Sequence, residues 1–332
     1  MQLTASWIAA LSQRRRSLFS HTTLTATVEK TKLTSINVCK NDTRVDIILK
    51  KTLAWLVIVR ILVTGSEGFL GKVLVRELET QSHQVIRYDI SLGKDILDSQ
   101  QLYADLTNAD VCIHLAAVAD LYIAENNPQL AREVNIDATR KILQVAEELG
   151  VRILFASTVC AYGNNGVELC TEHSPLAPTE VYAQSKAAAE ELFKEKLNNH
   201  SILRLATFYG PNMRSSLATS IFIKAIKNGE LINIHGNGQQ TRCYTHVEDI
   251  ASGIITVLDS EENGIFNISS DEEMNVIDLI DLIAKIVGKT AKTIHVEDRF
   301  GQINKSRISA AKLRKLGWRP KYSLETGLKT CI

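Results

Sequence analysis

Several features that would narrow the function of this 332-residue chain are missing. The six cysteines form no Cys-x-x-Cys pair and have no metal-ligand spacing, which favours free thiols in a reducing compartment and no metal site. The longest apolar run, residues 53–63, is interrupted by Arg60 and is too short to span a bilayer. A net charge of +1 does not indicate a nucleic-acid or membrane partner. We therefore expect a cytoplasmic protein.

The first 57 residues differ from the rest. They contain no acidic residue before Glu29, are rich in serine and threonine, and include the triplet Arg14–Arg16. Residues 1–58 hold nine Lys or Arg against three acids, whereas the remainder holds 29 against 34. Two interpretations stay open: an organelle transit peptide, or an upstream region translated from a misplaced start with the protein proper beginning near Val59. In both, residues 1–57 are an extension outside the domains, and we expect residues 1–50 to contribute nothing to activity.

Apolar runs alternate with segments of helical periodicity in the rest of the chain. Strands are predicted at 57–65, 83–90, 109–117, 151–158 and 201–210, and helices at 68–81, 135–150 and 181–197. Strands alternating with helices indicate βαβ units with right-handed crossovers. We therefore predict an α/β fold with a doubly wound parallel Rossmann sheet. No internal repeat and no low-complexity linker interrupts the pattern.

Three glycines lie between the first predicted strand and its helix. Gly65, Gly68 and Gly71 would let the backbone turn tightly and approach a pyrophosphate, which the free N–H groups of the helix N-terminus would attract. Asp89 stands at the end of the next strand, where an acid accepts hydrogen bonds from ribose hydroxyls and repels a 2′-phosphate. This pattern predicts NAD rather than NADP, although Arg87 lies on the same strand face. The alternative for Asp89 is a turn residue at a strand end.

A candidate catalytic set follows the fourth predicted strand. Tyr182 and Lys186 are four residues apart on one helix face, and Ser157 and Thr158 end the strand at the edge of the sheet where ligands bind. A free tyrosine has a pKa of about 10, which a neighbouring ammonium and a cationic nicotinamide are expected to lower so that the phenolate acts as a base. Lys186 would also hydrogen-bond the nicotinamide ribose, and Thr158 would hold the substrate oxygen. Taken singly, these residues have ordinary alternatives: an interface aromatic, a solvated lysine and a strand-end cap.

The Gly-x-x-Gly-x-x-Gly spacing with this set resembles the short-chain dehydrogenase/reductase superfamily. The stretches "KDILD", "HLAA", "NIDATRKIL", "LRLATFYGP", "GNGQQTRCYTHVEDIA", "GIFNISS" and "LGWRPKYSLETGL" are similar, in order, to the NAD-dependent epimerase/dehydratase family of UDP-galactose 4-epimerases and related nucleotide-sugar enzymes. The resemblance covers about residues 58–330. It implies NAD as cofactor, a nucleotide sugar as substrate, and a homodimer as the usual assembly.

The same resemblance implies the site residues. Thr158, Tyr182 and Lys186 would be catalytic, and Asn135 would support the catalytic helix. The residues implied for NAD are Gly65, Gly68, Phe69, Leu70, Gly71, Asp89, Asp95, Ile96, Leu115, Ala116, Ala117, Asn135, Ser157, Tyr182 and Lys186. Those implied for the substrate are Thr158, Thr207, Arg242 and Arg299. The two arginines would grip the diphosphate or the nucleotide, and the alternative for them is ordinary surface charge.

Several positions depart from the family pattern. Thr207 replaces an Asn that touches the sugar nucleotide in many members, and Cys243 replaces a usual Asp. In the resembled 4,6-dehydratases an Asp and a Glu directly follow the catalytic Thr, whereas Val159 and Cys160 stand here. A valine cannot transfer a proton, and a thiol is a poor substitute for a carboxylic acid. Other carboxylates, such as Glu180 or Glu248, could reach the site from loops.

The resemblance, together with these departures, implies C4 epimerisation of a nucleotide sugar, a UDP-sugar above others, through a transient 4-keto intermediate. We expect an NAD-binding domain over residues 58–206, with a returning segment near 241–268, and a substrate-binding lobe over 207–332. The alternatives are an NAD-dependent nucleotide-sugar oxidoreductase or dehydratase of the same family. A catalytically silent protein that binds NAD or a sugar nucleotide is a further alternative, against which the intact Tyr182, Lys186 and Thr158 argue.

Overall fold

The computed structural model describes residues 58–166, 168–299 and 301–332, and the predictions for residues 1–57 lie outside the described residues. Six parallel strands form a sheet with the order β2-β1-β3-β4-β5-β9. They are β1 (Arg60–Thr64), β2 (Gln84–Tyr88), β3 (Val111–His114), β4 (Arg152–Thr158), β5 (Ser201–Leu205) and β9 (Gly264–Ile268). The strand order reverses between β1 and β3, which makes the sheet doubly wound and confirms the predicted fold class.

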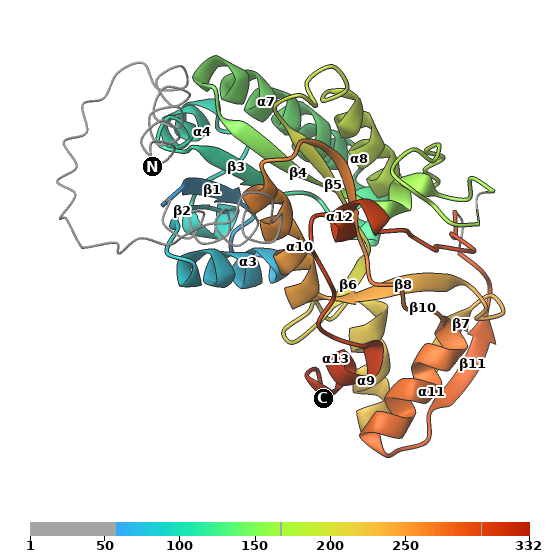
Figure 1. Cartoon of the computed structure of the whole chain (residues 1–332). Coiled ribbons are helices and arrows are strands. Elements are labelled where there is room, and N and C mark those ends of the chain that lie inside the picture. Colours follow the sequence, from blue (N-terminus) through green and yellow to red (C-terminus); the bar gives the residue numbers. More distant parts are fainter. Residues whose placement is uncertain (1–57, 167, 300) are drawn as a thin grey trace, which may run out of the picture. The chain divides into compact units, whose positions relative to one another are not determined.

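Helices cover both faces of this sheet (Figure 1). On one face, α3 (Phe69–Thr80) and α10 (Val247–Ser260) pack on the strands through leucine, isoleucine and valine side chains. On the other face lie α4 (Ser99–Leu106), α7 (Ala138–Leu149) and α8 (Val181–Glu191), with a second apolar core beneath them. Strands buried on both sides need near-continuous apolar sequence, which β1, β3 and β4 have. Within the described ranges, no helix is long and apolar enough to cross a membrane.

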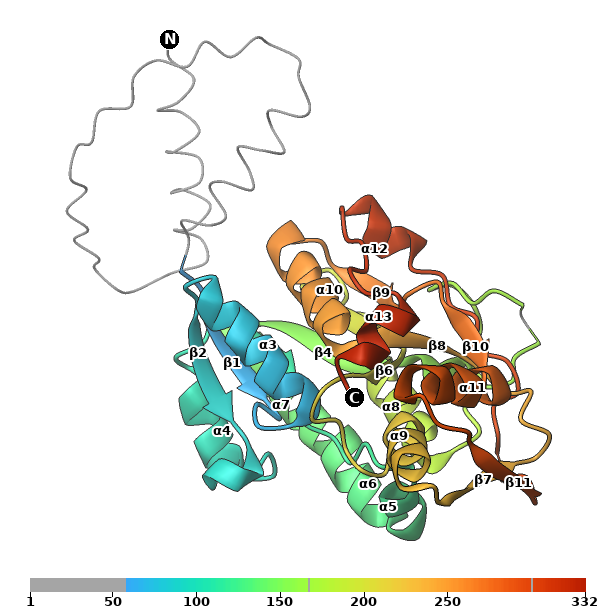
Figure 2. The same cartoon turned by 90° about the horizontal axis from the view of Figure 1, so that it is seen from below.

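The carboxyl-terminal half adds a smaller lobe with its own core. One three-stranded sheet contains β10 (Glu273–Asn275), β8 (Thr241–His246) and β6 (Thr207–Tyr209), and a strand pair joins β11 (Lys292–Val296) to β7 (Leu231–His235). Around them lie α9 (Ala218–Asn228), α11 (Val276–Val287) and α13 (Leu324–Lys329), and Figure 2 shows the same grouping from a second direction. The remaining elements are η1 (Ile90–Leu92), α5 (Leu121–Asn126), α6 (Pro128–Arg132), η2 (Glu133–Asp137), η3 (Val159–Tyr162) and α12 (Ala311–Lys315).

The strand predicted over 201–210 is two strands. The backbone N–H of Ala206 donates to the Ile268 carbonyl at 3.0 Å, so β5 ends in the large sheet and β6 begins in the small one. The helix predicted over 181–197 also ends early, at Glu191. Beyond it the chain tightens into i→i+3 turns that place Phe193 against Phe155, with ring centroids 5.1 Å apart.

The helix predicted over 135–150 starts before the sequence pattern suggests. Pro128 begins α6, which runs through the π-helical turn η2 into α7. A proline fits the first helical position because its nitrogen needs no intrahelical partner there. The π turn holds Asn135, which is fully buried, and such turns often occur at functional sites.

Candidate functional site

The loop between β1 and α3 leaves backbone space that side chains would fill. Gly65 has a φ of +70°, and a Cβ there would lie 2.9 Å from the Ala116 nitrogen. A Cβ on Gly71 would overlap the Gly65 carbonyl oxygen. Gly68 caps α3 without a side-chain hydrogen bond, and the buried Ser66 Oγ is without a partner in the described residues. Open N–H groups at a helix N-terminus and an unsatisfied hydroxyl fit the pyrophosphate of a dinucleotide.

Asp89 lies against this loop at the end of β2. Its Oδ2 accepts a hydrogen bond from the Glu67 N–H at 3.0 Å, and its Oδ1 accepts from the Ser91 N–H and hydroxyl at 3.0 and 2.8 Å. The positive charge of Arg87 is already paired with carboxylates. Its guanidinium donates to both oxygens of Glu79, at 3.0 and 3.1 Å, and to Glu67 at 3.4 Å. The negative charge at this corner therefore suits ribose hydroxyls and disfavours a 2′-phosphate.

The other residues implied for NAD lie on the loops that follow β2 and β3. The Oδ1 of Asp95 accepts a hydrogen bond from the Leu97 N–H at 2.9 Å. The backbone carbonyl of Asp95 accepts one from the Tyr88 hydroxyl at 2.6 Å. Ile96 is nearly buried and joins the core beneath α4 and α7. The 115–117 stretch follows β3, where the Ala116 N–H donates to the Thr64 hydroxyl at 3.1 Å beside the glycine loop.

The structure brings Thr158 and Tyr182 together. Thr158 ends β4 and caps η3, its Oγ1 accepting from the Cys160 N–H at 3.1 Å, and its hydroxyl is also a hydrogen-bond partner of the Tyr182 phenol. Lys186 follows Tyr182 by one turn of α8, and its Nζ lies 4.0 Å from the centroid of the Phe155 ring. The three residues implied as catalytic therefore share one corner at the carboxyl edge of the sheet.

Burial dominates the titration of these groups. It raises the pKa of the Tyr182 phenol well above its usual value, and the hydrogen bond with Thr158 opposes that shift. It lowers the pKa of Lys186 to about 7, while the carboxylate of Glu190 acts in the opposite direction. The sequence led us to expect a lowered pKa for Tyr182. In the protein by itself the result is the reverse, because desolvation of a buried phenolate outweighs the stabilisation that nearby groups supply.

Asn135 ties α8 to the chain that follows β3. Its Oδ1 accepts from the Val118 N–H at 2.8 Å, and its Nδ2 donates to the Val118 carbonyl at 3.2 Å and the Ser185 hydroxyl at 2.9 Å. Ser185 in turn donates to the Tyr182 carbonyl at 2.7 Å. These contacts fit the expected role of Asn135 in supporting α8. Both polar atoms of its side chain already have protein partners.

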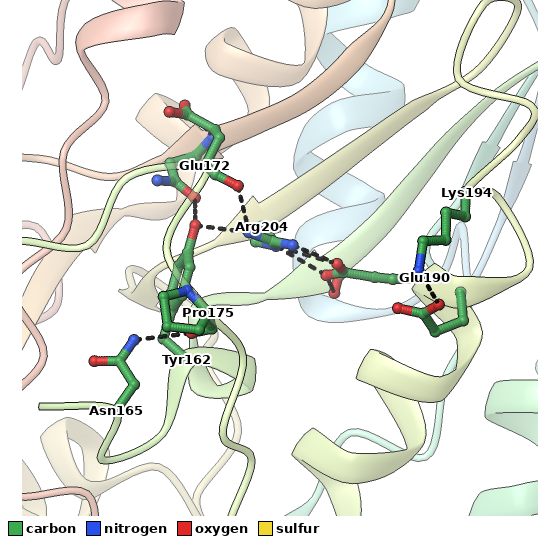
Figure 3. Close-up of polar contacts among 10 residues, drawn as sticks. Tyr162, Asn165, Glu172, Pro175, Glu190, Lys194 and Arg204 are labelled. Atoms are coloured by element: carbon green, nitrogen blue, oxygen red, sulfur yellow. Dashed lines mark hydrogen bonds and ion pairs between the residues drawn. The ribbon is translucent and has the colours of Figure 1, made fainter. Parts of the chain in front are cut away.

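The hydroxyl of Ser157 also has a protein partner. It donates to the Glu190 carboxylate at 2.5 Å, so a contact with NAD would have to use other atoms of this residue. Glu190 forms a buried ion pair with Arg204, which also donates to the Tyr162 hydroxyl at 2.9 Å (Figure 3). Sequence reasoning missed Glu190 and Arg204, although Glu190 follows Lys186 at the same four-residue spacing by which Lys186 follows Tyr182.

Two of the residues implied for the substrate, Arg242 and Arg299, lie near Glu180, the residue that precedes α8. Arg242 on β8 donates to the carbonyls of Thr241 and Ile303, both at 2.7 Å, and Arg299 lies over the Tyr122 ring at 6.0 Å. Burial raises the pKa of Glu180, and the charges of Arg299 and Arg242 oppose this shift. Both arginines are thus close enough to act on one carboxylate beside the catalytic corner. Thr207 lies on β6 as the register partner of Tyr244.

The two residues after Thr158 provide no carboxylate. Val159 is 3% exposed and packs in an apolar cluster that also holds Cys243. Burial raises the pKa of the Cys160 thiol, which keeps it protonated. Glu248 lies on α10, where it accepts hydrogen bonds from Arg76 at 3.1 Å and from the Tyr322 hydroxyl at 2.8 Å. Of the two carboxylates that we considered, only Glu180 acts on Tyr182.

Comparisons with known proteins show which family and which structures the chain is similar to. The sequence pattern described as the NAD dependent epimerase/dehydratase family matches residues 61–269. The low-salt glycan biosynthesis protein Agl12 of Haloferax volcanii is 29% identical over 82% of this chain and 97% of its own. The UDP-N-acetyl-alpha-D-glucosaminuronate decarboxylase of Bacillus cytotoxicus is 28% identical over 82% and 96%. The crystal structure of the Thermus thermophilus UDP-glucose 4-epimerase with NAD is 26% identical, with a TM-score of 0.75 over 82% of this chain and 97% of that one.

Proposed function

Because the chain belongs to the NAD-dependent epimerase/dehydratase family, with NAD as its cofactor, we propose that it epimerises a nucleotide sugar at C4, with a UDP-sugar as the preferred substrate. The glycine loop and Asp89 would hold NAD, since the loop has backbone space for a pyrophosphate and Asp89 suits the adenosine ribose. When bound, NAD supplies an acceptor that takes a hydride from a sugar carbon and can return it. Epimerisation consumes nothing, so one cofactor can serve many turnovers.

The catalytic corner supplies the proton chemistry. Tyr182 removes the proton of the 4-hydroxyl and later returns it, and Thr158 holds the same sugar oxygen. Lys186, when protonated, places a positive charge one helical turn from the phenol, which favours the phenolate. Arg242 and Arg299 would bind the diphosphate, for which guanidinium groups are well suited.

The observation that carries the choice of epimerisation is the chemistry of the side chains at residues 159 and 160. Dehydration must remove a C5 proton and expel the C6 hydroxyl as water, which requires an additional acid–base pair. Val159 is buried among apolar side chains, and Cys160 is a thiol whose pKa burial raises. Neither can replace a carboxylic acid near neutral pH.

Two other reactions have specific support. Glu180 acts on Tyr182 and has a pKa that burial raises, so it is the candidate acid for a dehydratase. A relative with 28% identity is a decarboxylase, which favours a test with a uronic-acid nucleotide.

The experiment is incubation of the purified protein and NAD with UDP-, dTDP- and GDP-sugars and with UDP-glucuronate, followed by mass spectrometry and NMR. We expect a C4 epimer of unchanged mass and no net NADH. A product lighter by one water would overturn the proposal in favour of a dehydratase, and one lighter by carbon dioxide in favour of a decarboxylase. Accumulating NADH would identify a net oxidoreductase. Binding without any product would identify a silent protein.

A further inference from the structure

A buried ion pair joins Glu190 of α8 to Arg204 of β5 (Figure 3), and Glu190 follows Lys186 by one helical turn. The side chains of Arg204 and Glu190 are only 4% and 5% exposed. Arg204 donates to Glu190 from Nε at 3.1 and 3.2 Å and from Nη2 at 2.7 Å. Ser157, which is the register partner of Arg204 across β4 and β5, donates to the same carboxylate. The carboxylate is therefore fixed by two neighbouring strands.

The rest of the guanidinium is satisfied as well. Its Nη1 donates to the Tyr162 hydroxyl at 2.9 Å and to the Glu172 carbonyl at 3.2 Å. Burying an ion pair is expensive, and well-packed apolar side chains of similar volume are often at least as stabilising. Stability alone therefore gives no reason for a pair at this place, so a contribution to the adjacent site is the better explanation.

Glu190 is the negatively charged group that acts on Lys186. Residues four apart on a helix share a face, so Glu190 lies next to Lys186 along α8. The other groups around the lysine are the Phe155 ring of β4 and His114 of β3, and Tyr182 precedes it by one turn of α8. Burial and the charge of Lys186 both lower the pKa of His114, which keeps it neutral. Among the described residues, the ammonium, 2% exposed, thus depends on one carboxylate for compensation.

We propose that Glu190 is a positioning residue that keeps the buried Lys186 ammonium charged, and that the ion pair with Arg204 serves to fix its carboxylate. The inference rests on the proposed function only for the role of Lys186 in turnover. The protonation of Lys186 can be measured without any substrate.

The direct test is an NMR titration of the full chain with ε-¹³C-labelled lysine, in which the Lys186 signal is assigned from its loss in Lys186→Arg. In Glu190→Gln we expect the titration midpoint to fall by about one pH unit, a tenfold change in the protonation constant. Glu191→Gln is the matched control, because Glu191 is the next residue of α8, is 65% exposed and pairs only with Lys194 in the described residues. It should leave the midpoint unchanged.

Removing Glu190 alone leaves Arg204 buried without its anion, which is strongly destabilising. The double variant Glu190→Gln/Arg204→Met removes both charges and should fold, with a midpoint below that of the wild type but above that of Glu190→Gln, because the repulsion by Arg204 is removed as well. An unchanged midpoint in the folded double variant would overturn the proposal. Failure of both variants to fold would also overturn it, since the pair would then be needed for stability.

The variant Asn135→Ala distinguishes an electrostatic role of Glu190 from a purely structural one, because it removes a hydrogen bond to α8 without removing a charge. We expect this variant to lower kcat with the Lys186 midpoint unchanged. In Glu190→Gln the basic limb of the kcat profile should move to lower pH while KM for the sugar stays within about twofold. If the wild-type protein turns over no sugar, the proposed function fails, and the titration still decides the role of Glu190.

Discussion

Replacing Tyr182 by Phe removes one oxygen atom from the catalytic corner and leaves the rest in place. Thr158 loses its phenol partner and keeps the hydrogen bond from the Cys160 N–H. The cost in unfolding free energy is therefore that of one hydrogen bond, about 1 kcal/mol. NAD should still bind, because the glycine loop and Asp89 are untouched. Loss of the proton-transferring group should lower kcat by ~10²–10⁴-fold, equivalent to about 3–5 kcal/mol on the barrier.

The assay measures kcat with the sugar found in the substrate panel, NAD binding by calorimetry and stability by urea denaturation. Tyr209→Phe is the matched control: Tyr209 is 1% exposed, and its hydroxyl donates one hydrogen bond, to the Leu324 carbonyl at 3.3 Å, in the core of the smaller lobe. It should lose similar stability and keep full turnover. Undiminished kcat in a folded, NAD-binding Tyr182→Phe variant would remove this tyrosine from the mechanism.

Three further outcomes follow from the site. Gly71→Ala puts a methyl group onto the Gly65 carbonyl, so we expect NAD to bind more than about tenfold more weakly in calorimetry. Normal binding would refute the assignment of the glycine loop to NAD. Asp89→Asn keeps the shape of the side chain while removing its charge, so the affinity for NADP relative to NAD should rise by about tenfold in a fluorescence titration; an unchanged ratio would assign the discrimination elsewhere. Burial lowers the pKa of Lys186 to about 7, so between pH 7 and the higher pKa of the unfolded chain the unfolded state binds more protons and stability rises with pH. Relative to Lys186→Met, the wild-type unfolding free energy should rise by up to about 1.4 kcal/mol per pH unit from about pH 7 to about pH 9.5 in urea titrations, and parallel curves would contradict the depressed pKa.

Much of the cofactor region could be predicted because its determinants are local in sequence. The apolar strand, the glycines and the following helix are one continuous stretch, and Asp89 follows at the end of the next strand. A position that needs a positive φ, such as residue 65, is recognisable in the sequence because it is occupied by glycine. The end of α8 at Glu191 was not predictable in this way, because the apolar periodicity continues into turns that bury Phe193.

The electrostatics of the site depend on contacts between residues that are far apart in the sequence. Desolvation raises the pKa of Tyr182, and the degree to which a side chain is shielded from water is a property of the whole fold. The hydroxyl of Ser157 faces Glu190 only because β4 and β5 pair in the register that sets it beside Arg204. Motif matching assigned Ser157 to the cofactor from its place at the strand end and gave no information on that register.

The spacing on α8 nevertheless contained a usable signal. Tyr182, Lys186 and Glu190 recur every four residues, so all three lie on the helix face that turns toward the sheet. A charged side chain on a buried face requires an opposite charge from the strands it covers, because an unpaired buried carboxylate would be very costly. Of the residues in β4 and β5, the arginines are Arg152 and Arg204, and only Arg204 lies at the carboxyl end beside the catalytic corner. The four-residue spacing and the burial of α8 together therefore lead to the ion pair with Glu190, which the glycine and tyrosine motifs alone do not reveal.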